Sequence, residues 1–295
     1  MSSINRRSWP ALVALALAGC GDDTGPLDDQ QVDELGSALR DEVETSVAAF
    51  FPRGVLLPFS ERQVSTAATL APLPLCATAS PPLTSSDDDI IPDSTVFTFT
   101  VPPCTYDGVR DGLVEVTGQV EIVDLTPVST GFDYRARLGD LAYRYVSQDL
   151  RDTYTVLRNG SRVLSGNGTG LILDQSIQSQ RTLAELVAQA NQDWHATFTP
   201  ATDGSLVVNE PLPDGTILID GTLAWARAGE SFSLDVTTAT PLEYDADCVD
   251  TPQRIRRGEL RGAATFNGQD GYIRLVWTDC GDEPEIRFVA ATPAG

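Results

Sequence analysis

Residues 111–122 read Asp-Gly-Leu-Val-Glu-Val-Thr-Gly-Gln-Val-Glu-Ile, and from Val114 onward every second position is apolar or glycine. A period of two places these side chains on one face of a β-strand. Residues 214–225 repeat the pattern, and residues 260–266 repeat part of it. In each copy a glycine falls on the apolar face, where it lets a long strand bend or admits a bulky neighbour. We therefore predict three long, curved strands, with these glycines at positions 118, 221 and 262.

Turn signals between other alternating segments predict that hairpins join the strands. Asn159-Gly160 is the best two-residue turn signal in the chain, because both residues tolerate the positive φ that tight hairpin turns require. Further turns are expected at Gly139-Asp140 and at residues 202–204, where the strand at 194–198 would return as a strand at 206–208.

The last hairpin has an expected register. A four-residue loop at 267–270 pairs Ala264 with Ile273 and Gly262 with Leu275. This register keeps the apolar side chains of both strands on one face, whereas a five-residue loop would mix the two faces.

The expected fold is mainly β, with an antiparallel, curved sheet that forms either a sandwich or a half-open barrel. Residues 52–295 are expected to form a single β domain, because all-β domains of this length are common. The sequence Thr-Leu-Ala-Glu at 182–185 is a capping box, so we favour a second short helix over a strand at 182–190.

Residues 32–51 carry apolar side chains at three- and four-residue steps, which predicts one amphipathic helix. Asp28 or Asp29 can cap its start, and Pro52 ends the pattern. We expect the helix to pack on the β domain through its Val and Leu side chains, with a polar face formed by Asp33, Glu34, Arg40, Asp41, Glu42 and Glu44.

Arg6 and Arg7 lie near the start of the chain and are followed by an apolar run at residues 9–17, which is typical of a secretory signal and too short to span a membrane. The run ends in Leu17-Ala18-Gly19-Cys20, which resembles the lipobox of bacterial lipoproteins. The resemblance implies that residues 1–19 are removed, that Cys20 carries a lipid anchor, and that residues 20–31 form a tether. Because the residue after Cys20 is Gly21 rather than Asp, we expect the outer membrane. The alternative is a plain signal peptide cut near Ala18.

The charge balance limits the partners. The whole chain has 20 basic and 42 acidic residues, and a mature chain that starts at Cys20 has lost Arg6 and Arg7 and has a formal net charge of −24. A nucleic-acid partner is excluded because it requires cations that neutralise phosphates. Every basic residue apart from the one histidine is arginine, so lysine-based chemistry is excluded as well. The expected partners are the membrane, through Cys20, and an unknown envelope protein or ligand.

Four further cysteines, an even number in an exported chain, predict two disulfides. Three pairings are possible, and we favour Cys76 with Cys104 and Cys248 with Cys280 because each pair brackets a local stretch of strand and turn.

Residues 85–93 read Ser-Ser-Asp-Asp-Asp-Ile-Ile-Pro-Asp, which resembles the calcium loops of thrombospondin type 3 repeats. The resemblance implies calcium as a cofactor, with Asp87, Asp89 and Asp93 as its ligands. Ser85 and Ile90 stand where the motif has Asp and Gly, so we favour the alternative, a solvated acidic loop, and expect no other cofactor.

No catalytic residue is assigned. The single histidine, His195, is expected on the solvent side of a strand, and a carboxylate pair for glycoside hydrolysis would have to come from different strands, because Glu115 and Glu121 lie roughly 20 Å apart on one strand.

Arginines near the C-terminus, Arg257, Arg261 and Arg274, could form an anion-binding patch, although pairing with the chain's own acids is the favoured alternative. The expected function is therefore non-catalytic binding or scaffolding in the bacterial envelope. The alternatives are an apolar-ligand carrier built as a half-open barrel and a carboxylate-dependent glycoside hydrolase.

Overall fold

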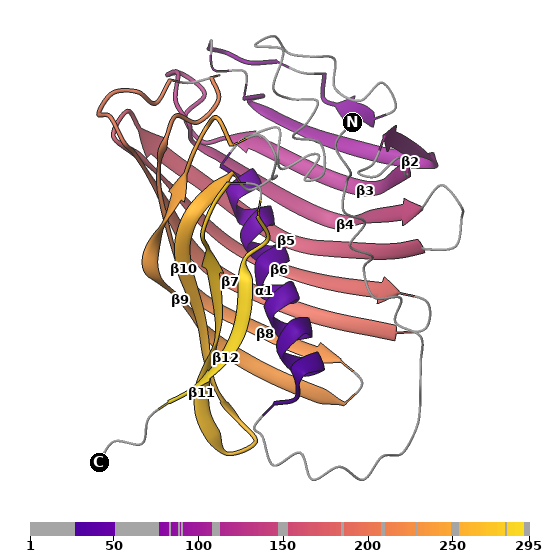
Figure 1. Cartoon of the computed structure of the whole chain (residues 1–295). Coiled ribbons are helices and arrows are strands. Elements are labelled where there is room, and N and C mark those ends of the chain that lie inside the picture. The colour runs from indigo at the N-terminus through magenta and orange to yellow at the C-terminus, as the bar shows by residue number, and fades with distance from the viewer. Residues whose placement is uncertain are drawn as a thin grey trace, which may run out of the picture.

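The computed structural model describes residues 27–50, 77–82, 84–87, 89, 91–107, 113–146, 153–183, 186–207, 210–227, 229–248, 254–280 and 282–291. These residues form one antiparallel sheet of twelve strands, each paired with the next along the chain, and one helix (Figure 1). The elements are α1 (Asp29–Ala48), β1 (Ala77–Ser80), β2 (Ser94–Asp107), β3 (Leu113–Asp124), β4 (Tyr134–Val146), β5 (Thr153–Asn167), β6 (Gly170–Leu183), β7 (Leu186–Pro200), β8 (Gly215–Arg227), β9 (Glu230–Tyr244), β10 (Ile255–Phe266), β11 (Gln269–Trp277) and β12 (Glu285–Ala290).

The sheet is strongly curved, and β1 and β12 do not pair with each other, so the barrel stays open. Figure 1 shows α1 on the concave side, between the middle strands behind it and the C-terminal strands in front of it. The prediction of a mainly β fold with a curved, antiparallel sheet is confirmed. Because all twelve strands belong to one unclosed sheet, the fold is the half-open barrel rather than the sandwich. Within the described residues, no helix is long and apolar enough to cross a membrane.

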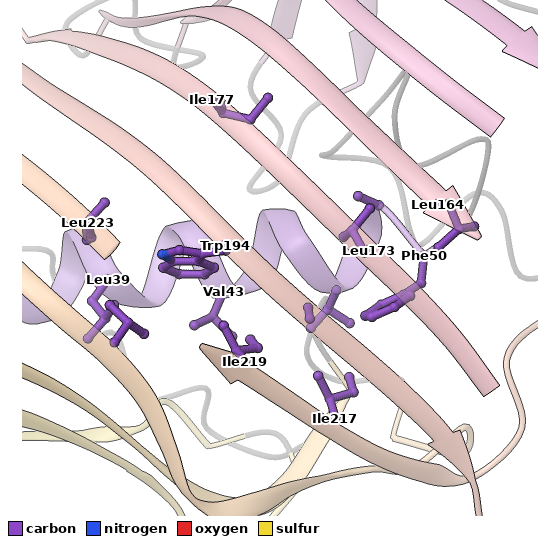
Figure 2. Packing of buried hydrophobic residues seen from close by; sticks show 14 of the residues in the cluster. Leu39, Val43, Phe50, Leu164, Leu173, Ile177, Trp194, Ile217, Ile219 and Leu223 are labelled. Atoms are coloured by element: carbon purple, nitrogen blue, oxygen red, sulfur yellow. The ribbon is translucent and has the colours of Figure 1, made fainter. Parts of the chain in front are cut away.

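The apolar side of α1 fills the concave face. Leu35, Leu39, Val43 and Val47 are fully buried and belong to the same core cluster as the inward-facing side chains of the sheet. Figure 2 shows Leu39 and Val43 beside Trp194, Ile219 and Leu223. The predicted packing of the helix on the domain is therefore confirmed.

The helix begins earlier and ends earlier than the predicted 32–51. Asp28 is its N-cap and accepts a hydrogen bond from the backbone N–H of Gln31 at 2.7 Å, while the Gln31 side chain accepts one from the N–H of Asp28 at 3.0 Å. This capping box begins the helix at Asp29, so the last residues assigned to the tether are helical. Placing Glu42 on the solvent side was wrong, because its side chain is buried against the sheet.

The three long strands predicted from the alternating pattern are β3, β8 and β10. The two glycine behaviours expected on the apolar face are both present. Gly221 has a φ of +141° and lies so close to β7 that a Cβ would be 2.1 Å from the carbonyl oxygen of Asp193. A Cβ at Gly262 would meet Leu234 at 3.1 Å and Leu39 of α1 at 3.4 Å, so this glycine makes room for bulky neighbours.

Two predicted hairpin turns are wrong, because both signals lie inside continuous strands. Asn159-Gly160 is in the middle of β5, and Gly139-Asp140 is in the middle of β4. There, Gly139 and Asp140 together oppose the single residue Asn159, which is the geometry of a β-bulge. The side chain of Asn159 accepts a hydrogen bond from the N–H of Asp140 at 2.8 Å, so the residues read as two turns stabilise one bulge.

The predicted second helix at 182–190 is wrong. Thr182 and Leu183 end β6, and residues from Leu186 onward belong to β7, where burial alternates along much of the strand. Pairing with both β6 and β8 along the length of β7 outweighs the local capping signal. The predicted return strand after the turn at 202–204 is also wrong, since Leu206 and Val207 are not in a strand and β7 pairs with β8 instead.

The last hairpin has a tighter turn than expected. Phe266 pairs with Gln269 across a two-residue turn, which shifts the register by two residues and pairs Gly262 with Ile273. A shift of two leaves every side chain on its predicted face. The apolar face of the hairpin is therefore correct although the register is not.

Candidate functional site

Three carboxylates from two separate segments meet at one end of the sheet. Asp87 and Asp89 lie in the connection between β1 and β2, and Asp124 is the last residue of β3. One carboxylate oxygen of each lies within 4.8 Å of the other two. The backbone brings them together, because the N–H of Asp124 donates to the carbonyl oxygens of Pro92 at 3.2 Å and Asp93 at 3.3 Å. We call Asp87, Asp89 and Asp124 the acidic cluster.

Hydrogen bonds occupy only part of the acidic cluster. Asp124 Oδ1 accepts from the N–H of Thr126 at 2.7 Å, and Asp89 Oδ1 accepts from the N–H of Ile91 at 2.9 Å. Asp87 Oδ1 accepts from the N–H of Asp89 at 3.1 Å. In contrast, Oδ2 of Asp87 and Oδ2 of Asp124 are buried and have no hydrogen-bond partner among the described residues.

Burial disfavours the charged forms of Asp89 and Asp124, whereas hydrogen bonds from Asp89 and Ser85 outweigh burial at Asp87 and lower its pKa. Asp89 is fully buried, and burial together with the neighbouring charges of Asp124 and Asp87 raises its pKa to about 6. Burial also raises the pKa of Asp124, opposed by the hydrogen bond from Thr126. At neutral pH the cluster therefore concentrates negative charge in a space with few compensating donors.

Only two of the three predicted calcium ligands belong to the acidic cluster. Asp87 and Asp89 are in the acidic cluster, whereas both oxygens of Asp93 accept hydrogen bonds from Ser86, at 2.8 Å from its N–H and at 2.7 Å from its hydroxyl. Asp124 was not predicted. Its signal is an acid at the position where the alternation of β3, through Val120 and Ile122, calls for another apolar residue.

A second group of polar side chains is buried between α1 and the strands β5 to β7. Glu42 accepts hydrogen bonds from the hydroxyl of Ser179 at 3.1 Å and from Arg181 at 3.3 Å. Arg181 also pairs with Asp41. The Ser46 hydroxyl contacts the side-chain amides of Gln175 and Gln192. This network seats the polar side of α1 on the sheet.

Two arginines of this buried group are not neutralised by a described acid at salt-bridge distance. Arg158 donates to the hydroxyl of Thr45 at 2.9 Å and lies 6.0 Å from the ring centre of Tyr143. Arg162 is 2% exposed, and its Nε and Nη2 have no partner within the described part of the chain. Burial and the charge of Arg158 lower the pKa of Arg162 to about 10. The interior thus holds two arginines of β5, four positions apart, without an acid at salt-bridge distance among the described residues.

The arginines expected to form an anion-binding patch are each paired with an acid. Arg257 forms an ion pair with Glu243 at 2.6 Å, and Glu259 forms ion pairs with both Arg261 and Arg274 at 2.6 Å. Arg261 and Arg274 face each other directly across β10 and β11. Their arrangement matches the alternative in which these arginines compensate the chain's own acids.

The remaining candidates lie on the solvent side of the sheet. His195 is half exposed, as predicted, and its Nδ1 lies 2.7 Å from Asp174 Oδ1 on the adjacent strand. Glu115 pairs with Arg144 at 2.6 Å and Glu121 with Arg137 at 3.3 Å. Both glutamates are therefore held in ion pairs with arginines of the neighbouring strand.

The structure describes one of the two predicted disulfides. Cys248 and Cys280 form a disulfide, as predicted. Cys76 and the side chain of Cys104 lie outside the described residues, as do the proposed signal peptide, Cys20 and the first part of the tether.

In comparisons with known proteins, the chain matches no family model, no curated protein and no solved structure.

Proposed function

We propose that this protein is a lipid-anchored, non-catalytic protein of the bacterial envelope whose β domain binds or organises another envelope component. The anchor rests on the lipobox-like Leu17-Ala18-Gly19-Cys20, and two or three acyl chains on one cysteine hold a protein stably on a membrane. The expected site is the outer membrane.

The filled concave face is the observation that carries the choice of a binding or scaffolding role. A half-open barrel that carries an apolar ligand needs an open apolar surface. Here Leu35, Leu39, Val43 and Val47 of α1 occupy that surface and are fully buried. The domain is thus a closed body whose outer surfaces are available to a partner.

The arginine pair under α1 favours one alternative, a carrier for an anionic amphiphile. Arg158 and Arg162 are buried within the polar group beneath α1, and their unpartnered N–H groups suit a carboxylate or phosphate headgroup. Such a ligand could reach them only if α1 moved away from the sheet, because α1 now lies over this region.

A disulfide staple between α1 and β12 separates the two functions. A Cβ at Gly36 would lie 3.2 Å from Cβ of Ile286, close to the spacing of about 3.8 Å found in disulfides. In the Gly36→Cys/Ile286→Cys variant, α1 cannot leave the sheet until the bond is reduced. Binding of a fluorescent fatty acid is measured before and after reduction, with the wild-type protein carried through the same reduction as the control.

The proposed function predicts that neither form binds the fatty acid stoichiometrically and that cross-linking in intact cells captures a protein of the envelope. Stoichiometric uptake by the wild type, lost in the stapled form and restored by reduction, would replace the proposal with the carrier. The anchor is tested separately: radiolabelled palmitate should label the wild type and not Cys20→Ala, and equal labelling would rule out a lipid on Cys20.

A further inference from the structure

The acidic cluster lies apart from the concave face and does not depend on the proposed function. Three carboxylates meet within 4.8 Å, and two of them, Asp89 and Asp124, are buried to 0% and 4% exposure. Clusters of acids are common on protein surfaces without any ligand, but buried carboxylates that face one another require a compensating charge.

The unpartnered oxygens show where that compensation is missing. Asp124 Oδ1 is taken by Thr126, yet its Oδ2 is buried without a donor, and Oδ2 of Asp87 is in the same state. A buried acceptor without a partner is unfavourable, and more so when it is charged.

We propose that Asp87, Asp89 and Asp124 bind a divalent cation, for which Ca²⁺ is the best match. All available ligand atoms are carboxylate oxygens, which hard cations prefer. A calcium ion makes bonds of about 2.3–2.6 Å, so it can touch oxygens that are up to about 4.8 Å apart, whereas the bonds of about 2.0–2.1 Å of Mg²⁺ span less. Calcium also tolerates irregular geometry and completes its shell with water.

An open polar cleft adjoins the site. Thr126 and Gly131, whose N–H groups donate to Asp124 and Asp89, also line this cleft, which lies between the β3–β4 connection and residues 166–168. A bound cation would tie the connection between β1 and β2 to the end of β3. It would therefore stabilise the edge of the sheet formed by β1 to β3, which is far along the chain from the Cys248–Cys280 disulfide.

The test is calorimetric titration of CaCl₂ into the full processed chain, purified in detergent and stripped with EDTA. Asp124→Asn keeps the acceptor for Thr126 but removes a charge from the cluster, and should weaken calcium binding by at least about tenfold. Asp133→Asn is the matched control, since Asp133 lies in the neighbouring connection outside the cluster and should bind as the wild type does. MgCl₂ should bind more weakly than CaCl₂.

Thermal unfolding gives a second readout that a purely structural role would not produce. In EDTA, Asp124→Asn should be at least as stable as the wild type because it relieves repulsion, whereas with calcium the wild type should become the more stable protein. The absence of calcium binding by the wild type at millimolar concentration would overturn the proposal. Loss of binding in Asp93→Asn with retention in Asp124→Asn would also overturn it, because it would assign the site to the loop alone.

Discussion

Gly36 of α1 lies directly against Ile286 of β12: a Cβ at position 36 would be 2.1 Å from Cγ2 of Ile286. The contact joins an early helix to the last strand of the sheet. It also lets α1 approach the sheet closely enough for Leu35 and Leu39 to be fully buried. The glycine is thus part of the packing that fills the half-open barrel.

Gly36→Ala should destabilise the domain, although alanine is the better helix former by about 1 kcal/mol. The added methyl group overlaps Ile286, and overpacking of this kind costs about 1–3 kcal/mol. Urea unfolding measures the change. Adding Ile286→Ala should recover part of the loss by removing the overlapping atoms. The proposed contact would be contradicted if the double variant lost more unfolding free energy than the two single variants together.

Gly221→Ala should cost at least about 2 kcal/mol of unfolding free energy, because the position combines a φ of +141° with a Cβ that would lie 2.1 Å from a backbone oxygen. The matched control is Gly168→Ala, where a Cβ would meet nothing within 4 Å and no positive φ adds strain. Equal effects of the two substitutions would show that the positive φ and the close approach of β7 at Gly221 do not limit stability.

Stability should fall as the pH rises from about 4.5 to about 7, in part because of Glu44. Burial raises the pKa of Glu44 to about 7, helped by Asp41 and Glu283 and opposed by Arg40 and Arg181. The folded state keeps this proton over a range in which the unfolded state releases it, so each step up in pH favours unfolding. Glu44→Gln should flatten the profile and be more stable than the wild type at pH 8, and an unchanged slope would argue against this assignment.

Arg162→Met should leave the domain equally stable or stabilise it by about 1 kcal/mol or more, because it replaces a buried cation without a close acid partner by an apolar side chain of similar length. Arg181→Met is the control of the same chemistry. Arg181 pairs with Asp41 and Glu42, so its loss should cost about 3 kcal/mol. Chemical unfolding of both variants checks the contrast, which a large loss in Arg162→Met would contradict.

Replacing both Cys248 and Cys280 with alanine should lower the unfolding free energy by roughly 3–4 kcal/mol, the chain-entropy effect for a loop of 32 residues. Thiol titration of the denatured, unreduced protein extends the test to the other pair. A Cys20→Ala protein should show no free thiol, and two free thiols would mean that Cys76 and Cys104 do not form the second predicted bond.

Local patterns predicted the elements well where their causes are local. Alternation identified β3, β8 and β10 together with their buried faces, and the apolar spacing identified α1, because side-chain direction follows directly from the repeat of each element. The turn signals failed for a corresponding reason. Asn and Gly tolerate unusual φ values equally in a hairpin turn and in a bulge, so the residues alone do not distinguish the two.

The sequence alone was sufficient for the fold class, the faces of the long strands and the helix with its cap, since each depends on residues a few positions apart. Pairing between neighbouring strands decided that Asn159 supports a bulge inside a sheet whose strands continue past it. Tertiary packing also buried Arg162 beneath α1 and brought Asp124 to Asp87 and Asp89 across more than thirty residues of chain. These contacts depend on how the whole sheet curves: the strand pattern predicts that the sheet is curved, but not which distant residues the curvature brings together.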